Sequence, residues 1–228
     1  MKTISPKNAK YAATVENVKE LRLTGNANLE FWNKHFADKP FQVFDNQGFA
    51  EITISATELV WKGFRYNELT ITLALAEKDN PHKQVGVFML HAFNTNRFFA
   101  FCERAFFSTP YYFGRINLQE TGLFSMNASG HKQVLFTAEM SETERPINEV
   151  NDNWEGAVFL KKEKYFIAKL LGETKVYPFL ESDKIILKSD AKHSVFEQLI
   201  NSGFMAKEWR WRADAFHAKS KTYSIPRK

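Results

Sequence analysis

Six histidines and one cysteine are the side chains of this 228-residue sequence that most readily bind metal ions or act as nucleophiles. No two histidines have ligand spacing on one predicted helix, and Cys102 alone can form neither a thiolate cluster nor an internal disulfide. The sequence also lacks a glycine-rich phosphate loop and a GxSxG nucleophile elbow. We therefore predict no metal site and no cofactor.

His91 is the histidine with the most suggestive position, because it directly follows an apolar run over residues 85–90. An imidazole at a strand end can act as a general base near neutral pH. It can equally be a structural residue that hydrogen-bonds to nearby backbone, which is the more common use of such a position. His91 is kept as a candidate base.

Tryptophan and arginine alternate strictly over residues 209–212 (WRWR). Bases of a single-stranded nucleic acid could stack on the indoles while the arginines contact phosphates. A strand with Trp on one face and solvated Arg on the other is the simpler interpretation. The formal net charge of +5 is modest and spread along the chain, so we predict no nucleic-acid partner.

A polar face along residues 68–76 marks one predicted strand as a cavity wall. One face of this strand is apolar and carries Leu69, Ile71, Leu73 and Leu75. The other face is polar or small and carries Glu68, Thr70, Thr72, Ala74 and Ala76. We expect the second face to line a cavity, with solvent exposure of Glu68 as the alternative.

The remaining periodicities predict a mainly β chain with a few short helices, an α+β composition built on a sandwich or closed barrel. Further strands are predicted at 51–57, 85–90, 131–140, 156–160, 165–171 and 174–179, and helices at 28–36, 95–108 and 194–202. The helix at 95–108 has a broad apolar stripe that should face the protein. Residues 141–153 are polar and show no sustained period, and we predict that they form a long loop or lid.

Length and composition are consistent with one domain over residues 1–228, since all-β domains of roughly 200 to 250 residues are common. The chain is 44% hydrophobic and contains 22 Phe, so it is either densely packed or holds an apolar ligand. No signal peptide or membrane span is evident, which predicts a cytoplasmic protein without a membrane partner.

The segment at residues 104–114 (RAFFSTPYYFG), together with the Glu68 strand and residues 85–88 (VGVF), resembles the acetoacetate decarboxylase-like superfamily, including its uncharacterised bacterial branches. Looser similarity extends from about Leu21 to the Tyr223 region. The resemblance implies a cone-shaped, largely antiparallel β-barrel. It also implies that the interior holds a small molecule with a carboxylate or a carbonyl group.

Two tyrosines replace the lysines of that superfamily's decarboxylases. In those enzymes the proline is followed by two lysines, one of which forms a Schiff base while the neighbouring charge lowers its pKa. Here the corresponding residues are Tyr111 and Tyr112. A phenol cannot form an imine, so the resemblance implies loss of Schiff-base decarboxylation at this position. Lys169, on a predicted strand, is a substitute amine.

The resemblance implies four ligand-binding residues: Glu68, Arg104, Tyr111 and Tyr112. Arg104 lies where the superfamily carries an arginine that could hold a carboxylate in a bidentate pair. The tyrosines offer hydroxyl groups and flat rings. The alternatives are an exposed helix arginine and tyrosines that simply pack beside the Pro110 turn.

We therefore predict a protein that binds a small organic acid or carbonyl compound in a barrel pocket and is not a Schiff-base decarboxylase. One alternative is a lyase or isomerase that acts on a keto or enol substrate, with Glu68 or His91 as base and a tyrosine hydroxyl, such as that of Tyr112, as acid. Another is a structural or interaction protein without a ligand. The sequence leaves open whether copies of the chain form a homo-oligomer.

Overall fold

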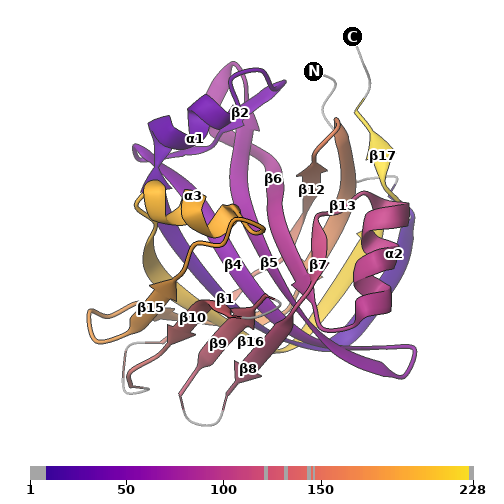
Figure 1. The fold of residues 1–228 in the computed structure, drawn as a ribbon, viewed down its shortest axis with the longest axis vertical. Coiled ribbons are helices and arrows are strands. Elements are labelled where there is room, and N and C mark those ends of the chain that lie inside the picture. Colours follow the sequence, from indigo (N-terminus) through magenta and orange to yellow (C-terminus); the bar gives the residue numbers. More distant parts are fainter. Residues whose placement is uncertain (1–8, 121–122, 131–132, 143–144, 146, 226–228) are drawn as a thin grey trace.

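A closed ring of antiparallel strands forms the centre of the computed structural model, which describes residues 9–120, 123–130, 133–142, 145 and 147–225 (Figure 1). β16 pairs with both β13 and β1, and this pairing closes the ring. Among the neighbouring strands of the ring, β6 and β12 are the one pair that runs parallel. The ring contains β1 (Tyr11–Asn28), β4 (Phe49–Trp61), β5 (Phe64–Glu77), β6 (Asn80–Asn94), β12 (Trp154–Leu160), β13 (Lys164–Leu171) and β16 (Met205–Ser220).

Shorter strands extend this barrel, and a second sheet packs beside it. β2 (Phe41–Val43), β3 (Asp45–Asn46), β7 (Tyr111–Phe113), β11 (Asn148–Asn151), β14 (Glu173–Pro178) and β17 (Tyr223–Ser224) belong to the barrel sheet. The second sheet contains β8 (Arg115–Gln119), β9 (Ser125–Ser129), β10 (Val134–Glu139) and β15 (Lys184–Leu187). The helices are α1 (Leu29–His35), α2 (Arg97–Phe107) and α3 (Val195–Asn201). The prediction of a mainly β barrel with a few short helices is confirmed.

The main hydrophobic core lies on the outer face of the barrel wall. The side chains of Leu69, Ile71 and Leu73 on β5 are fully buried and join one cluster with Met126 of β9 and Phe196 of α3. The apolar face of the wall is therefore covered by the second sheet and the helices. The opposite, polar face of β5 is left to face the barrel interior, as the alternation predicts.

The three predicted helices are present, but the stripe on α2 does not face the protein as predicted. Phe98, Phe101 and Phe106 are 66%, 54% and 72% exposed, whereas Ala100 is buried. The helix begins at an Asn96 cap, whose side chain accepts hydrogen bonds from the Phe98 and Phe99 N–H groups. This helix lies over one end of the barrel (Figure 1), so its inward face is narrow.

The segment 141–153, predicted as a loop, is partly ordered by a strand and by a buried ion pair. β11 pairs with β14, and Arg145 Nη1 lies 2.8 Å from Asp183 Oδ2 with both side chains almost fully buried. The predicted strand at 131–140 is β10, and residues 131–132 lie outside the described part. Within the described ranges, no helix has the length and apolar character needed to span a membrane.

Candidate functional site

A cavity of about 390 Å³ lies inside the ring of strands, and we call it the barrel cavity. Every strand of the ring contributes to its wall. The interior is open because the apolar faces of the strands pack outward. Glu68, Thr70 and Thr72 of the polar face of β5 line it, whereas Ala74 and Ala76 of the same predicted face do not. Neighbouring strands add hydroxyl groups at Thr24, Thr53, Ser55 and Thr57.

Glu68 and Tyr111 meet at one side of the barrel cavity. The Tyr111 hydroxyl donates a hydrogen bond of 2.7 Å to Glu68 Oε2, and Asn94 Nδ2 donates one of 2.9 Å to Oε1. The register explains this meeting: Glu68 is paired with Asn94 across β5 and β6, and β7 runs parallel to β6 on its other edge. Two of the predicted ligand-binding residues thus share one hydrogen bond.

The surroundings of Glu68 make this carboxyl a weak acid. Burial raises the pKa of Glu68 to about 7, and the nearby Glu103 carboxylate adds to the rise. The hydrogen bonds from Tyr111 and Asn94 and the charge of Lys219 act in the opposite direction. Burial and the same two carboxyls raise the pKa of Tyr111 well above its ordinary value, so this phenol remains a hydrogen-bond donor. Glu68 can therefore accept or donate a proton near neutral pH.

A lysine that sequence reasoning did not single out also lines the barrel cavity. Lys219 on β16 forms an ion pair with Glu103 of α2, and its Nζ lies 4.6 Å from the centre of the Phe166 ring. Thr109 Oγ1 donates a 2.6 Å hydrogen bond to the same carboxylate. Of the described residues that line the cavity, Lys219 is the one that carries a primary amine.

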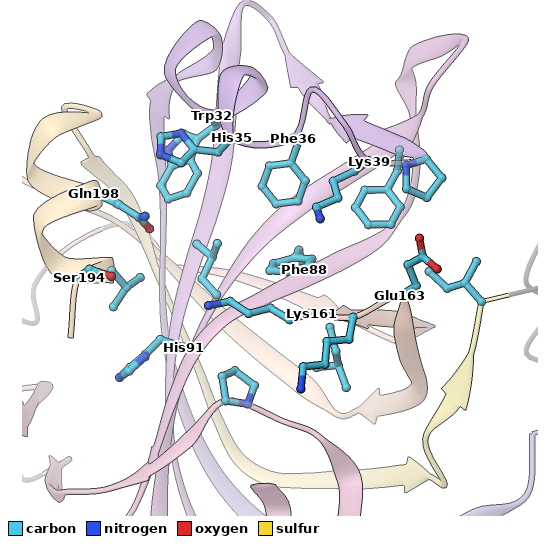
Figure 2. Close-up of a pocket in the computed structure, with 18 of the residues that line it drawn as sticks. Trp32, His35, Phe36, Lys39, Phe88, His91, Lys161, Glu163, Ser194 and Gln198 are labelled. Carbon is cyan, nitrogen blue, oxygen red and sulfur yellow. The ribbon is translucent and has the colours of Figure 1, made fainter. Parts of the chain in front are cut away.

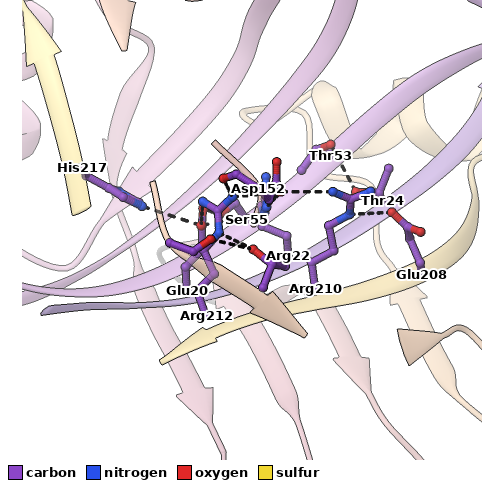
Figure 3. A network of polar contacts seen from close by, with 12 residues as sticks. Glu20, Arg22, Thr24, Thr53, Ser55, Asp152, Glu208, Arg210, Arg212 and His217 are labelled. Atoms are coloured by element: carbon purple, nitrogen blue, oxygen red, sulfur yellow. Dashed lines mark hydrogen bonds and ion pairs between the residues drawn. The ribbon is translucent and has the colours of Figure 1, made fainter. Parts of the chain in front are cut away.

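A network of arginines and carboxylates borders another part of the cavity wall (Figure 3). Arg212, almost fully buried, donates to Glu20 Oε2 at 3.0 Å and contacts Asp152 Oδ2 at 2.9 Å. Arg22 and Arg210 also bind Asp152. Burial alone would raise the pKa of Glu20, but Arg22, His217 and Arg212 outweigh it and hold that pKa below its usual range. Glu20 is therefore ionised.

Two buried side-chain nitrogens of residues that line the cavity have no hydrogen-bond partner among the residues that the structure describes. These buried atoms are Nε of Arg22 and Nε2 of His217. They lie 3.8 Å and 3.6 Å from Glu20 Oε2, beyond normal hydrogen-bond length. Both nitrogens are therefore held near the ionised Glu20 by charge and not by a hydrogen bond, and His217 contributes charge only when it is protonated.

Four other candidate residues do not face the barrel cavity. Arg104 is exposed, with its guanidinium 5.7 Å from the centre of the Tyr112 ring, because Ala100 and Glu103 form the inward face of α2. Tyr112 points to the side of β7 opposite Tyr111, as the alternation of a strand requires. Lys169 lies outside the cavity lining and 3.8 Å from Glu155.

His91, the fourth of these, lines a separate pocket on the outer side of the wall (Figure 2), and Tyr112 lines the same pocket. A bulge in β6 between the His91 and Met89 pairings turns His91 outward while Met89 faces the barrel cavity. Burial lowers the pKa of His91 to about 3, with His193 and Lys161 contributing. Its ring stacks on Tyr112 and lies 3.1 Å from His193 Nδ1. His91 is neutral and cannot share a ligand with Glu68 in the barrel.

The residues that the sequence analysis missed are mainly charged residues on the inward face of β1 and β16. Residues 20–24 (ELRLT) alternate as strictly as the strand at 68–76, and this signal could have identified β1. On β16 the alternation over residues 209–212 was recognised, but the prediction that its arginines face solvent is wrong for Arg212. Arg212 is almost fully buried because the strand closes the barrel and its polar face points inward. The missed residues are Glu20, Arg22, Glu103, Asp152, Arg210, Arg212, His217 and Lys219.

No protein-family model and no curated protein sequence matches the chain. Solved structures do match over nearly its whole length. Acetoacetate decarboxylase from Legionella pneumophila subsp. pneumophila str. Philadelphia 1 superposes with a TM-score of 0.67 at 9% identity, covering 99% of this chain and 93% of that one.

Two further solved structures are similar. The enduracididine biosynthesis enzyme MppR complexed with pyruvate gives a TM-score of 0.64 at 6% identity, over 97% of this chain and 93% of that one. An acetoacetate decarboxylase-like enzyme from Sphingomonas wittichii RW1 gives 0.56 at 12% identity, over 99% of both chains. Together with the closed ring of strands, these matches show that the chain has the acetoacetate decarboxylase-like fold, in agreement with the sequence resemblance.

Proposed function

We propose that this protein binds a small organic acid or carbonyl compound in the barrel cavity and does not form a Schiff base at the residues after Pro110. The observation that carries the proposal is the cavity of about 390 Å³ beside the Glu68–Tyr111 pair. This volume falls in the usual range for small-molecule pockets. Tyr111 stands in the cavity wall and does not fill the interior. The solved MppR complex with pyruvate, a small keto acid, supports the same ligand class.

The polar groups suggest how such a molecule is oriented. Its carboxylate would face the guanidinium groups of Arg22 and Arg210, which line the cavity. Its carbonyl or hydroxyl group would face Glu68 and Tyr111. The apolar wall at Val87, Met89 and Val158 would pack against its carbon skeleton.

Thermal-shift measurements against keto acids, hydroxy acids and aromatic acids test this proposal. A ligand at 100 times its Kd stabilises the folded state by about 2.7 kcal/mol, which should raise Tm by roughly 5 to 10 °C for a chain of this size. Arg22→Ala and Glu68→Gln should remove the shift. Arg104→Ala is the matched control, because Arg104 lies outside the cavity. The proposal fails if no acid in the panel shifts Tm, or if the control removes the shift as strongly as Arg22→Ala.

The second candidate function is acid-base catalysis on a keto or enol substrate. The raised pKa of Glu68, about 7, and its bond to the Tyr111 hydroxyl favour this function. Glu68 would act as base, and once it is protonated the Tyr111 hydroxyl would be released to donate to the developing enolate oxygen. In D₂O such an enzyme would exchange the methyl protons of pyruvate faster than buffer does, and Glu68→Gln would abolish the acceleration. Binding of pyruvate without accelerated exchange of its methyl protons would show that the protein binds the keto acid but does not catalyse enolisation.

Lys219 makes the rejection of imine chemistry testable. Its ammonium group is paired with Glu103, and a protonated amine is not a nucleophile. Borohydride treatment with a keto acid should therefore leave the mass of the protein unchanged. A covalent adduct mapped to Lys219 by peptide mass spectrometry would overturn this part of the proposal.

We also propose a cytoplasmic location, because a chain with a single cysteine can form no internal disulfide and so gives no support to an oxidising compartment.

A further inference from the structure

A second pocket of about 410 Å³, here called the outer pocket, lies on the far side of the barrel wall from the barrel cavity. It is enclosed by α1, the start of α3, the outward face of β6 and the turn between β12 and β13 (Figure 2). The described residues that line the two pockets do not overlap. A ligand in the outer pocket would therefore contact none of the described residues that line the barrel cavity.

The floor of the outer pocket is aromatic. The Phe36 and Phe88 rings meet edge to face with centres 5.1 Å apart, and Trp32 and Phe41 line the pocket beside them. Leu90 and Ile225 extend this apolar surface. Rigid rings of this kind favour a flat, apolar molecule, because they gain contact area without losing side-chain freedom on binding.

The rim of the outer pocket is cationic. Four exposed lysines stand around it: Lys39, Lys161, Lys162 and Lys192. No carboxylate in the described part of the chain forms an ion pair with any of them, and Glu163 is the one acidic residue that lines the pocket. In Figure 2 the Phe88 ring appears between the side chains of Lys39 and Lys161. This arrangement surrounds an apolar floor with positive charge and favours an anion there.

A buried indole N–H group in the outer pocket, that of Trp32, also favours a ligand there. Its side chain is only 1% exposed, and its indole Nε1 has no hydrogen-bond partner within the described ranges. Since an indole N–H usually finds a partner when it is buried, this donor is available to an acceptor brought by a ligand. The His91 ring at the other end of the pocket is neutral, so the positive charge of this site comes from the lysines.

We propose that the outer pocket binds an organic anion with a flat apolar body, such as an aromatic carboxylate or an aromatic phosphate ester. The body would lie on the Phe36 and Phe88 rings, and the anionic group would face the lysine rim. Lys161 and Lys192 come from different parts of the chain, the β12–β13 turn and the segment before α3, so a ligand would bridge two elements.

The Trp32 indole N–H provides a direct readout by ¹⁵N NMR. Its signal can be assigned by comparison with Trp32→Phe and followed during titration with 2-naphthoate. We expect a saturable shift with a Kd below about 1 mM that weakens as salt is added. Naphthalene-2-methanol, a neutral molecule of similar shape, should bind at least about fivefold more weakly. A parallel titration with 2-naphthyl phosphate determines whether the lysines prefer carboxylate or phosphate.

Surface substitutions separate charge recognition from folding. Lys161→Ala combined with Lys192→Ala should weaken 2-naphthoate binding about fivefold or more, since each exposed charge contributes modestly. Lys184→Ala, which removes an exposed lysine outside both pockets, is the matched control and should leave Kd unchanged. Arg22→Ala should also leave it unchanged. Equal binding of the neutral analogue, no effect of the lysine substitutions, or loss of binding in Arg22→Ala would each overturn the proposal.

Discussion

The pKa of Glu68 is set by neighbours that act in opposite directions, so substitution of one neighbour should change it measurably. The Tyr111 hydroxyl stabilises the ionised form, whereas burial and Glu103 oppose it. We expect Tyr111→Phe to raise the pKa of Glu68 further, since one hydrogen bond to the carboxylate is lost. A ¹³C NMR titration of the glutamate carboxyls measures this change. Tyr112→Phe, on the opposite side of β7, is the control and should leave the titration as it is.

The same carboxyl should make folding stability depend on pH. Because its folded pKa of about 7 lies above its ordinary value of 4.5, the folded protein retains a proton in this window that the unfolded chain releases. Stability should therefore fall as pH rises from about 4.5 to 7, by on the order of 2 kcal/mol from this group after allowance for solvent in the cavity. Urea denaturation of wild type and Glu68→Gln across this range should show a difference that grows with pH. A constant difference would contradict the raised pKa.

At the scale of single residues, periodicity predicted where β5 places its side chains. It could not identify which charged residues on other elements line the cavity. Glu68 and Tyr111 reach one cavity because strand alternation is a local property. Arg104 was misplaced because α2 presents Glu103 inward, and one residue along a helix turns the side chain by about 100°. Arg22 pairs with Asp152 and Lys219 pairs with Glu103, and both partners are more than 100 residues away in the sequence, so no local pattern could identify them.

At the scale of elements, the parallel junction between β6 and β12 depends on a glycine. Gly86 pairs with Ala157, and a Cβ atom at Gly86 would lie 2.2 Å from the Ala157 carbonyl oxygen. We expect Gly86→Ala to destabilise the protein by about 3 kcal/mol or more, because the two strands must separate. Chemical denaturation measures this loss.

Gly48 gives the matched control for that substitution. It also has a positive φ, but a Cβ atom there would meet open space. Gly48→Ala should cost only about 1 kcal/mol, the conformational part of the effect. If the two substitutions cost the same, close approach of the strands is not what Gly86 provides.

The elements themselves were largely predictable where one face is apolar and the other polar. The period of 2 located β4 and β5, a continuous apolar run located β6, and the period of 3.6 located the three helices. β1 was missed although residues 20–24 alternate, and the stripe of α2 was assigned to the wrong environment. Sequence shows that Phe98, Phe101 and Phe106 recur at helical spacing, but it cannot show how little of the helix the barrel end covers.

At the scale of the whole molecule, closure of the barrel brings β16 back to β1, and Arg212 stands at that closure. Its guanidinium binds Glu20 of β1, Thr174 of β14 and Asp152 before β12. The resemblance predicted the barrel as a unit, but neither it nor composition predicted that the polar face of the closing strand would be buried. That burial follows from ring closure, which is a property of no single segment.

Arg212→Met should therefore destabilise the protein by about 3 to 5 kcal/mol, because Glu20 is left buried with fewer partners. Arg210→Met is the control: Arg210 binds Asp152 from the same strand but is more exposed, so its loss should cost about 1 kcal/mol. Adding Glu20→Gln to Arg212→Met should recover part of the stability, since the uncompensated charge is removed. Urea denaturation of the single and double variants gives this coupling energy. Strictly additive losses would show that Arg212 and Glu20 do not stabilise the closed ring as a pair.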